Sequence, residues 1–209
     1  MQGLTRKIGR YLRRKVWADP AGLGRPVPAE VFDQEYRGGG WDHFFSFQEL
    51  PRNLVLAGLI HHLHPHARVL DVGCGSGRLA DVSRAYEFAR YLGVDVSAEG
   101  LAKARRLGLE RVEWVHGDFE HWRPATGDRF EAVVFNETIG YAADPGATLR
   151  AFAPHLADGG HLFVSYYRSG NWRALWRRID RSCEVEHETV ISSAHAHVWD
   201  IKVLRPRAG

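Results

Sequence analysis

A run of alternate glycines directly follows a short apolar segment of the chain. Residues 69–72 are apolar except for one acid, Asp71, and then come Gly73, Gly75 and Gly77. Glycines so placed let the backbone turn sharply and lie against a ligand where a Cβ would collide. A helix that begins after them presents unpaired N–H groups toward the same ligand. The run therefore predicts a loop that binds a nucleotide-type cofactor.

The spacing of the glycines distinguishes between cofactors. Dinucleotide loops read G-x-G-x-x-G, but this run reads G-x-G-x-G, and Arg78 stands where the third glycine would be. Asp71 precedes the first glycine by two residues, which suits an ammonium group and disfavours a pyrophosphate. The run resembles motif I of the class I S-adenosylmethionine (SAM)-dependent methyltransferases. This resemblance implies that the loop, including Cys74, lies under the methionine and ribose parts of SAM, and that Asp71 engages the amino group.

Two further acids follow later strands at spacings that suit the same ligand. Asp95 and Val96 end an apolar strand expected over 91–96, twenty residues after the middle glycine of the loop. An acid there can accept both ribose hydroxyls, in SAM enzymes and in dinucleotide enzymes alike. The resemblance further implies that Asp118 bonds the adenine amino group and that Phe119 packs against the adenine ring, which favours SAM over NAD. The structural alternative for Asp118 is a helix N-cap.

The residues that follow the fourth strand are the first candidates for catalysis. Methyl transfer is an in-line displacement in which holding the nucleophile near the methyl carbon supplies much of the rate. A hydroxyl acceptor also needs a general base, whereas an amine needs only to be neutral. The resemblance places Asn136, which we also expect to contact the cofactor, together with Glu137 and Tyr141 beside the methyl group. Glu137 is our first candidate for the base, followed by His43 and His116; its alternatives are substrate positioning and a helix cap.

The segment ahead of the first strand is rich in aromatic residues and glycine. It covers residues 31–45 and precedes a helix expected over 50–62. In small-molecule methyltransferases of the resembled type this segment often folds over the active site, and glycines beside aromatic anchors suit a loop that closes on a ligand. The alternative is a surface loop pinned by buried aromatic residues. The lid candidates are Tyr36, Trp41, His43 and Phe44.

The elements that position these residues alternate between strand and helix, which is typical of a parallel sheet covered on both faces. The first five strands are expected over 69–72, 91–96, 112–115, 130–135 and 161–166, with helices over 98–107 and 145–155 and a turn over 157–160. A helix over 172–179 then precedes strands over 183–192 and 197–204, whose four-residue link is too short for a parallel crossover. We therefore expect an α/β fold with a doubly wound, mostly parallel seven-stranded sheet, a C-terminal antiparallel hairpin and helices on both faces.

Composition and charge divide the chain into three segments. We expect a basic helix and linker over 1–28, a lid segment and helix over 29–66, and a SAM-binding domain over 67–209. Residues 1–15 carry six bases and no acid, and removing these from the 28 bases leaves 22 against 25 acids. The basic surface should therefore be confined to the arm. Its apolar residues recur at helical spacing, which would allow peripheral membrane contact through residues 1–16, although a solvated helix is the reading that we favour.

Several partner classes are disfavoured. Amino-directed DNA methyltransferases carry an Asp/Asn-Pro-Pro-aromatic run after the fourth strand, whereas this chain has Asn-Glu-Thr-Ile over 136–139. With a slightly acidic body and no target-recognition domain, we expect no nucleic acid substrate. Two cysteines, no apolar run of membrane length and no secretory signal indicate a cytoplasmic protein. The oligomeric state stays open.

Four histidines crowd the end of a helix just before the first strand: His61, His62, His64 and His66. Metal ligands on a helix usually recur at i and i+4, with an acid or a cysteine completing the set. Pro65 ends the helix here and no neighbouring acid or cysteine completes a set, so we expect no metal site.

The sequence thus predicts a SAM-dependent methyltransferase that acts on an oxygen or nitrogen of a small molecule, such as a sugar or another biosynthetic intermediate. Two alternatives remain. One is a non-catalytic SAM-binding protein, which keeps the pocket without the chemistry. The other is an NAD-dependent oxidoreductase. This alternative is disfavoured by Arg78, by Asp118 and by the expected C-terminal hairpin.

Overall fold

The computed structural model describes residues 27–193 and 197–207. The predictions for the basic arm, residues 1–16, and for nearly all of the segment 1–28 lie outside this part of the chain. Over the described residues, the structure has no helix with the length and apolar character that a membrane span requires.

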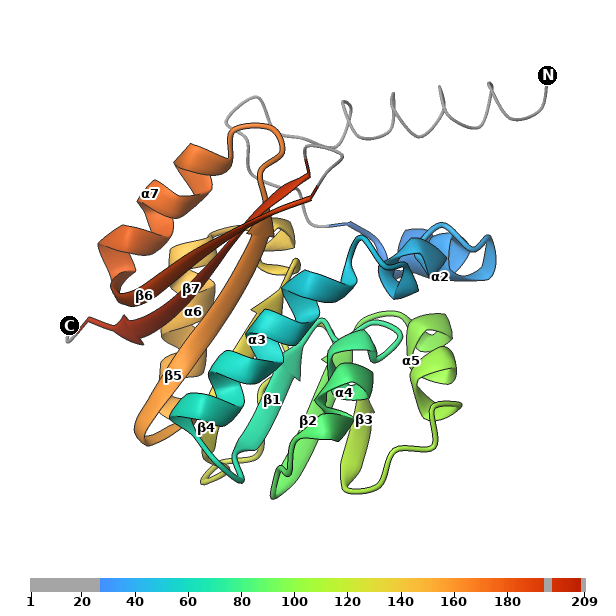
Figure 1. Ribbon diagram of the computed structural model, residues 1–209, viewed down its shortest axis with the longest axis horizontal. Helices are drawn as coiled ribbons and strands as arrows, with labels where there is room; N and C mark the ends of the chain where they lie inside the picture. The colour runs from blue at the N-terminus through green and yellow to red at the C-terminus, as the bar shows by residue number, and fades with distance from the viewer. Residues whose placement is uncertain (1–26, 194–196, 208–209) are drawn as a thin grey trace.

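A seven-stranded sheet with the order β3-β2-β1-β4-β5-β7-β6 forms the centre of the molecule (Figure 1). Its strands are β1 (Arg68–Val72), β2 (Arg90–Asp95), β3 (Val112–His116), β4 (Phe130–Asn136), β5 (Leu156–Tyr167), β6 (Cys183–Ser192) and β7 (Val198–Pro206). The first five are parallel, and β7 pairs antiparallel with both β5 and β6. The expected fold class, including the C-terminal hairpin, is confirmed.

Helices cover both faces of the sheet. They are α2 (Ala29–Arg37), α3 (Leu50–Leu63), α4 (Arg78–Val82), α5 (Ala98–Arg105), α6 (Pro145–Phe152) and α7 (Trp172–Ser182). In β1, Val69 packs toward α3 and α4, while Leu70 and Val72 pack toward α6 and α7. This alternation divides the core into two layers, as the period of a strand dictates. Side chains cap two of the helices at their N-termini: Ser97 accepts the Gly100 N–H in α5, and Asp144 accepts the Ala147 N–H in α6.

The structure differs from the sequence prediction at the start of β5. We expected a turn over 157–160, but the strand already begins at Leu156, which pairs with Phe130 across a register shift. Gly160 makes this shift feasible, because a Cβ there would lie 2.9 Å from the Phe130 carbonyl oxygen. The Asp-Gly-Gly run therefore marks an irregular strand pairing rather than the end of a strand.

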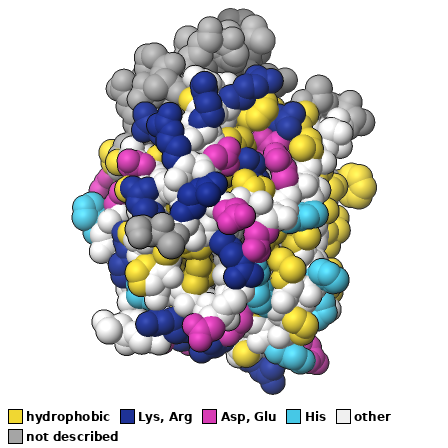
Figure 2. Space-filling model, turned by 90° about the vertical axis from the view of Figure 1, so that its left-hand side faces the viewer, with side chains coloured by type: hydrophobic (Ala, Val, Ile, Leu, Met, Phe, Trp, Pro, Cys, Tyr) yellow, Lys and Arg dark blue, Asp and Glu magenta, His cyan; other side chains and the backbone are white. Residues whose placement is uncertain are grey.

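A second difference concerns charge. We expected the basic surface to be confined to the N-terminal arm, but α7 exposes Arg173, Arg177, Arg178 and Arg181. Figure 2 shows the side of the molecule on which α7 lies, with Lys and Arg side chains gathered over its upper part. The average charge of the body conceals this surface, because acids elsewhere in the chain offset it.

Candidate functional site

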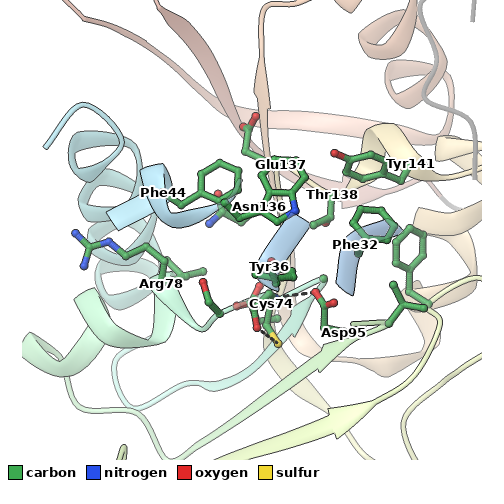
Figure 3. A pocket seen from close by; sticks show the side chains of 18 of the residues that line it. Phe32, Tyr36, Phe44, Cys74, Arg78, Asp95, Asn136, Glu137, Thr138 and Tyr141 are labelled. Atoms are coloured by element: carbon green, nitrogen blue, oxygen red, sulfur yellow. Dashed lines mark hydrogen bonds between the residues drawn. The ribbon is translucent and has the colours of Figure 1, made fainter. Parts of the chain in front are cut away.

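A cavity of about 300 Å³ opens at the carboxyl ends of the parallel strands, between the glycine loop and the segment that carries α2 and the 3-10 helix η1 (Asp42–Phe45). Ligands of open α/β sheets bind at this edge, where the chain order of the strands reverses, and here the reversal falls between β1 and β4. The pocket walls come from α2, η1, α3, the loop after β1 and the ends of β2 and β4 (Figure 3).

Most of the predicted site residues meet at this cavity. Those that line it are Tyr36, Trp41, Phe44, Asp71, Gly73, Cys74, Gly75, Asp95, Val96, Asp118, Phe119, Asn136, Glu137 and Tyr141. Gly77 does not line it; it takes a left-handed conformation at φ 78° and starts α4. The fold thus brings together fourteen residues that lie up to 105 positions apart in the sequence.

The two candidate histidines lie outside the pocket wall. The exposed ring of His43 turns back within its own segment, with Nδ1 at 2.8 Å from the Gly40 carbonyl oxygen. The ring of His116, at the end of β3, lies with Nε2 at 2.9 Å from the Val96 carbonyl oxygen. The geometry therefore does not support either histidine as the general base.

The glycine loop is in contact with the segments that cover it. A Cβ on Gly73 would collide with the Thr138 side chain, and a Cβ on Gly75 would collide with the Tyr36 hydroxyl. Both glycines also have positive φ, at 76° and 54°, which other residues rarely adopt. No other residue type would leave this backbone bare at the floor of the pocket.

Asp71 presents one unpaired oxygen in a fully buried setting. The residue is 1% exposed, its Oδ2 accepts a hydrogen bond of 2.7 Å from Tyr91 Oη, and Oδ1 has no partner among the described residues. Burial raises the pKa of Asp71 to about 7, against the Tyr91 hydrogen bond, which lowers it; Asp95 raises it further. A buried acceptor without a partner is costly, so Oδ1 marks a position where a bound donor would be stabilising.

Asp95 fastens the glycine loop to the start of α5. Its two carboxylate oxygens accept hydrogen bonds from the Gly75 N–H, at 2.7 Å, and the Ser97 N–H, at 2.8 Å. Burial raises the pKa of Asp95 to about 6, although these backbone donors lower it. Each oxygen keeps further acceptor capacity, so the carboxylate can still accept hydroxyl groups from the pocket.

Asp118 also has a local role. Its Oδ1 accepts the Glu120 N–H at 2.9 Å and its Oδ2 lies 3.1 Å from His121 Nδ1. These contacts lie within a turn, and since no helix begins between β3 and β4, Asp118 is not the helix N-cap that we considered as its alternative role. Phe119 beside it is partly buried and packs edge-to-face against Phe135, with ring centroids 6.3 Å apart. Both residues line the pocket at its β3 side.

The Glu137 carboxylate turns toward β5. It accepts hydrogen bonds of 2.9 Å from the Ser165 hydroxyl and 2.9 Å from the Tyr167 N–H, and Figure 3 shows it directed away from Tyr36 and Asp95. Desolvation raises the pKa of Glu137, against Arg52, Ser165 and Tyr167, which lower it. A general base needs a raised pKa and an oriented carboxylate. The role of Glu137 as the base stays a prediction.

A polar network on α3 forms part of the pocket that the sequence did not indicate. Arg52 is 2% exposed; it donates to Glu49 Oε2 at 2.8 Å and to Asn136 Oδ1, and its Nε has no partner among the described residues. Asn53 accepts a 3.0 Å hydrogen bond from the Asn136 amide. Two polar residues at buried positions of an otherwise apolar helix are the signal that could have revealed this network.

The covering segment is fixed to α5 by polar contacts. Asp33 accepts the Ser97 hydroxyl at 2.6 Å and the Glu99 N–H at 3.2 Å. Lys103 donates to Asp42 at 2.6 Å. Tyr36, 8% exposed, lies beneath these contacts between the glycine loop and the first turn of α5. The segment is thus docked over the pocket.

Comparison with known proteins agrees with this geometry. A family model described as a methyltransferase domain matches residues 42–204. A ubiquinone biosynthesis O-methyltransferase of Serratia proteamaculans is 39% identical over 100 residues, which cover 46% of this chain and 41% of that protein. The corresponding enzyme of Yersinia pestis is 37% identical over 101 residues, which cover 47% and 41%. The matches therefore span about two fifths of the length of these relatives.

Solved structures show the same fold. The N-methyltransferase NodS from Bradyrhizobium japonicum, in complex with S-adenosylhomocysteine (SAH), superposes with a TM-score of 0.72 at 16% identity, covering 86% of this chain and 98% of that one. The [4+2]-cyclase SpnF superposes with a TM-score of 0.60 at 20% identity, covering 75% and 82%. The family match, which covers most of the chain, and the topology lead to one conclusion: this chain belongs to the class I SAM-dependent methyltransferases, whose cofactor is SAM.

Proposed function

We propose that this protein transfers the methyl group of SAM to an oxygen or nitrogen atom of a small molecule. The observation that carries the proposal is the unpaired Asp71 Oδ1, which is buried beside a bare glycine backbone at the floor of the pocket. An ammonium group satisfies such an acceptor, and a charged hydrogen bond is the stronger kind. A pyrophosphate would instead meet a buried carboxylate. The pocket therefore fits SAM and does not fit NAD.

The remaining pocket residues fit the other parts of the same cofactor. Arg52, with its unpaired Nε, would hold the carboxylate of the methionine part. Asp95 would accept the ribose hydroxyls, and Asp118 with Phe119 would hold the adenine ring. When bound, the sulfonium supplies an activated methyl group. The protein then has to hold the acceptor in line with it and exclude water, and the docked α2 segment would exclude the water.

The acceptor side of the pocket is aromatic. Phe32 and Tyr141 meet edge-to-face with ring centroids 5.2 Å apart, and Trp41 and Phe44 stack with centroids also 5.2 Å apart. Such walls favour a flat, apolar acceptor that carries one hydroxyl or amino group. The curated relatives are named for O-methylation in ubiquinone biosynthesis. We therefore rank phenols and catechols first, aromatic amines second, and sugars, which we expected from the sequence, third.

The cavity size also bears on the class of partner. A space of about 300 Å³ under a docked segment admits a small molecule. A flipped nucleotide within a strand would need an open basic groove beside the pocket, whereas the exposed arginines of α7 belong to a helix that contributes no residue to the pocket wall. We keep the proposal of a small-molecule acceptor without nucleic acid.

Two measurements test this proposal. Calorimetric titration with SAM, SAH and NAD should give micromolar binding for the first two and none for NAD. Transfer of a labelled methyl group should then be measured over a panel of phenols, catechols, aromatic amines and sugars. Binding of NAD alone would overturn the cofactor assignment. Binding of SAM without turnover on any acceptor class would favour a non-catalytic or differently catalytic protein, a role that this fold permits because a cyclase shares it.

A further inference from the structure

Tyr91 lies on β2 beside the candidate cofactor carboxylate on β1. In the parallel register Asp71 faces Gly93, two residues further along the strand, so that the Tyr91 and Asp71 side chains emerge on the same face of the sheet. Tyr91 is 1% exposed, and its ring belongs to the core layer under α3 and α4. Its hydroxyl is the only polar atom of that ring, and it donates to Asp71 Oδ2 at 2.7 Å.

The two oxygens of Asp71 have different surroundings, because one accepts the Tyr91 hydrogen bond and the other faces no donor among the described residues. Oδ2 is anchored in the core, and this anchor fixes the rotation of the carboxylate so that Oδ1 is presented as the acceptor without a partner. We propose that Tyr91 is the positioning residue for amino-group recognition, holding Asp71 in the orientation and charge state that bind the ammonium of the cofactor. This inference rests on the proposed function, because it assumes that Asp71 meets that ammonium.

The surroundings of Asp71 explain why a donor is needed there. Burial disfavours its charged form, and Asp95 on β2 disfavours it further. Two further groups lie near enough for the negative charge of Asp71 to raise their pKa values, Cys74 in the glycine loop and Tyr36 on α2. Neither of them is a cation that could stabilise the Asp71 carboxylate. Of the groups that shift the pKa of Asp71 in the described structure, Tyr91 is the one that favours the carboxylate.

The Tyr91 hydroxyl remains a hydrogen-bond donor at every pH at which Asp71 titrates. Burial raises its own pKa well above the ordinary value, and the charge of Asp71 raises it further. The hydroxyl therefore keeps its proton while Asp71 loses its own. The pair thus acts in one direction, with Tyr91 donating and Asp71 accepting.

Tyr91→Phe tests this inference, because it removes one oxygen and keeps the packed ring. We expect the dissociation constant of SAH at pH 7 to rise about tenfold, since a hydrogen bond to a charged group is lost. The loss should be larger at pH 6 and smaller at pH 8.5, because the variant needs a higher pH to ionise Asp71. 5′-Methylthioadenosine, which lacks the amino-acid part, should bind both proteins equally at each pH.

Two controls separate this role from a general packing defect. Tyr86→Phe removes a hydroxyl outside the main cavity and should leave SAH binding unchanged. In an Asp71→Asn background, Tyr91→Phe should add little to the loss, since Tyr91 acts through Asp71. Thermal melting of each variant would confirm that it is folded.

The outcomes are distinguishable. If Tyr91→Phe weakens SAH and 5′-methylthioadenosine alike, or weakens SAH by the same factor at every pH, the positioning role is wrong. If the wild-type protein binds neither ligand, the proposed function fails and not only this inference.

Discussion

The Ser165 hydroxyl lies 2.8 Å from the Asn136 amide oxygen and 2.9 Å from the Glu137 carboxylate, so that its single proton is shared between these two acceptors. The Glu137 N–H in turn donates to Ser165 Oγ at 3.1 Å. Glu137 has a positive φ of 64°, a conformation that persists when surrounding contacts enforce it. The end of β4 is therefore fastened to β5 at the point where the pocket wall begins.

Glu137→Gln tests whether this fastened carboxylate is also the general base. We expect the substitution to lower the melting temperature, because an amide cannot accept both the Ser165 and the Tyr167 donors with its two terminal atoms. As the base, Glu137 should matter about a hundredfold for kcat with a hydroxyl acceptor and little with an amine. The measurement is the ratio of kcat with a hydroxyl acceptor to kcat with an amine acceptor, compared between the variant and the wild type.

Ser165→Ala is the matched control for this experiment. It removes one hydrogen bond to Glu137 and keeps the carboxylate, so it should lower stability by about 1 kcal/mol while leaving the ratio of the two kcat values near that of the wild type. If Glu137→Gln reduces turnover of hydroxyl and amine acceptors by the same factor, Glu137 stabilises the contact between the ends of β4 and β5 and is not the base.

Arg52→Met should both destabilise the protein and weaken cofactor binding. Glu49, 8% exposed, would lose its cation, and an uncompensated buried charge costs about 3–5 kcal/mol. Adding Glu49→Gln should restore part of that stability. It should not restore SAH affinity, because the carboxylate of the ligand would still lack its partner. Calorimetry with SAH and with 5′-methylthioadenosine distinguishes the two effects, and equal losses for both ligands would contradict the assignment of Arg52.

Gly100→Ala tests whether the covering segment and the cofactor pocket are coupled. Alanine favours a helix over glycine by about 1 kcal/mol, but a Cβ at this position would lie 2.8 Å from the Tyr36 ring. We expect SAH affinity to fall several-fold because Tyr36 is displaced, and limited proteolysis to cut the α2 segment faster. In a Tyr36→Leu background the same substitution should be neutral for binding. An equal loss in both backgrounds would show that Tyr36 does not mediate it.

The sheet and the cofactor loop could be predicted because their signals are local. The apolar runs fix the strands, and the four-residue link between the last two strands permits only an antiparallel hairpin. Asp71 and Asp95 are then brought to one edge because parallel strands end there together. Their place in the pocket follows from topology and requires no knowledge of side-chain contacts.

The parts that could not be predicted depend on contacts between distant segments. Arg52 reaches Asn136 across 84 positions of sequence, and no local pattern reports such a contact. The position of a candidate base is a contact of the same kind: His43 has the right residue type, but its ring lies against the Gly40 carbonyl oxygen and not in the pocket wall. Residue type could suggest candidates for catalysis, and only the geometry could select among them.

Asp71→Asn should change the stability of the cofactor-free protein in a pH-dependent way. The pKa of Asp71 is about 7 in the folded protein and 3.8 as its ordinary value. Between these values the folded state holds a proton that the unfolded state has lost, so the contribution of Asp71 to stability falls as pH rises and is level above pH 7. The asparagine variant does not titrate. Relative to the wild type it should therefore gain about 1 kcal/mol per pH unit from pH 4 to 7.

Denaturant unfolding of both proteins at several pH values checks this, and taking the difference cancels the titration of groups that the two proteins share, such as Asp95. Saturating SAH provides the decisive comparison. An ammonium beside Oδ1 stabilises the ionised carboxylate, so the wild type should then lose little stability over the same interval, while the variant should behave as before. A pH dependence that SAH leaves unchanged would mean that the cofactor's amino group lies elsewhere.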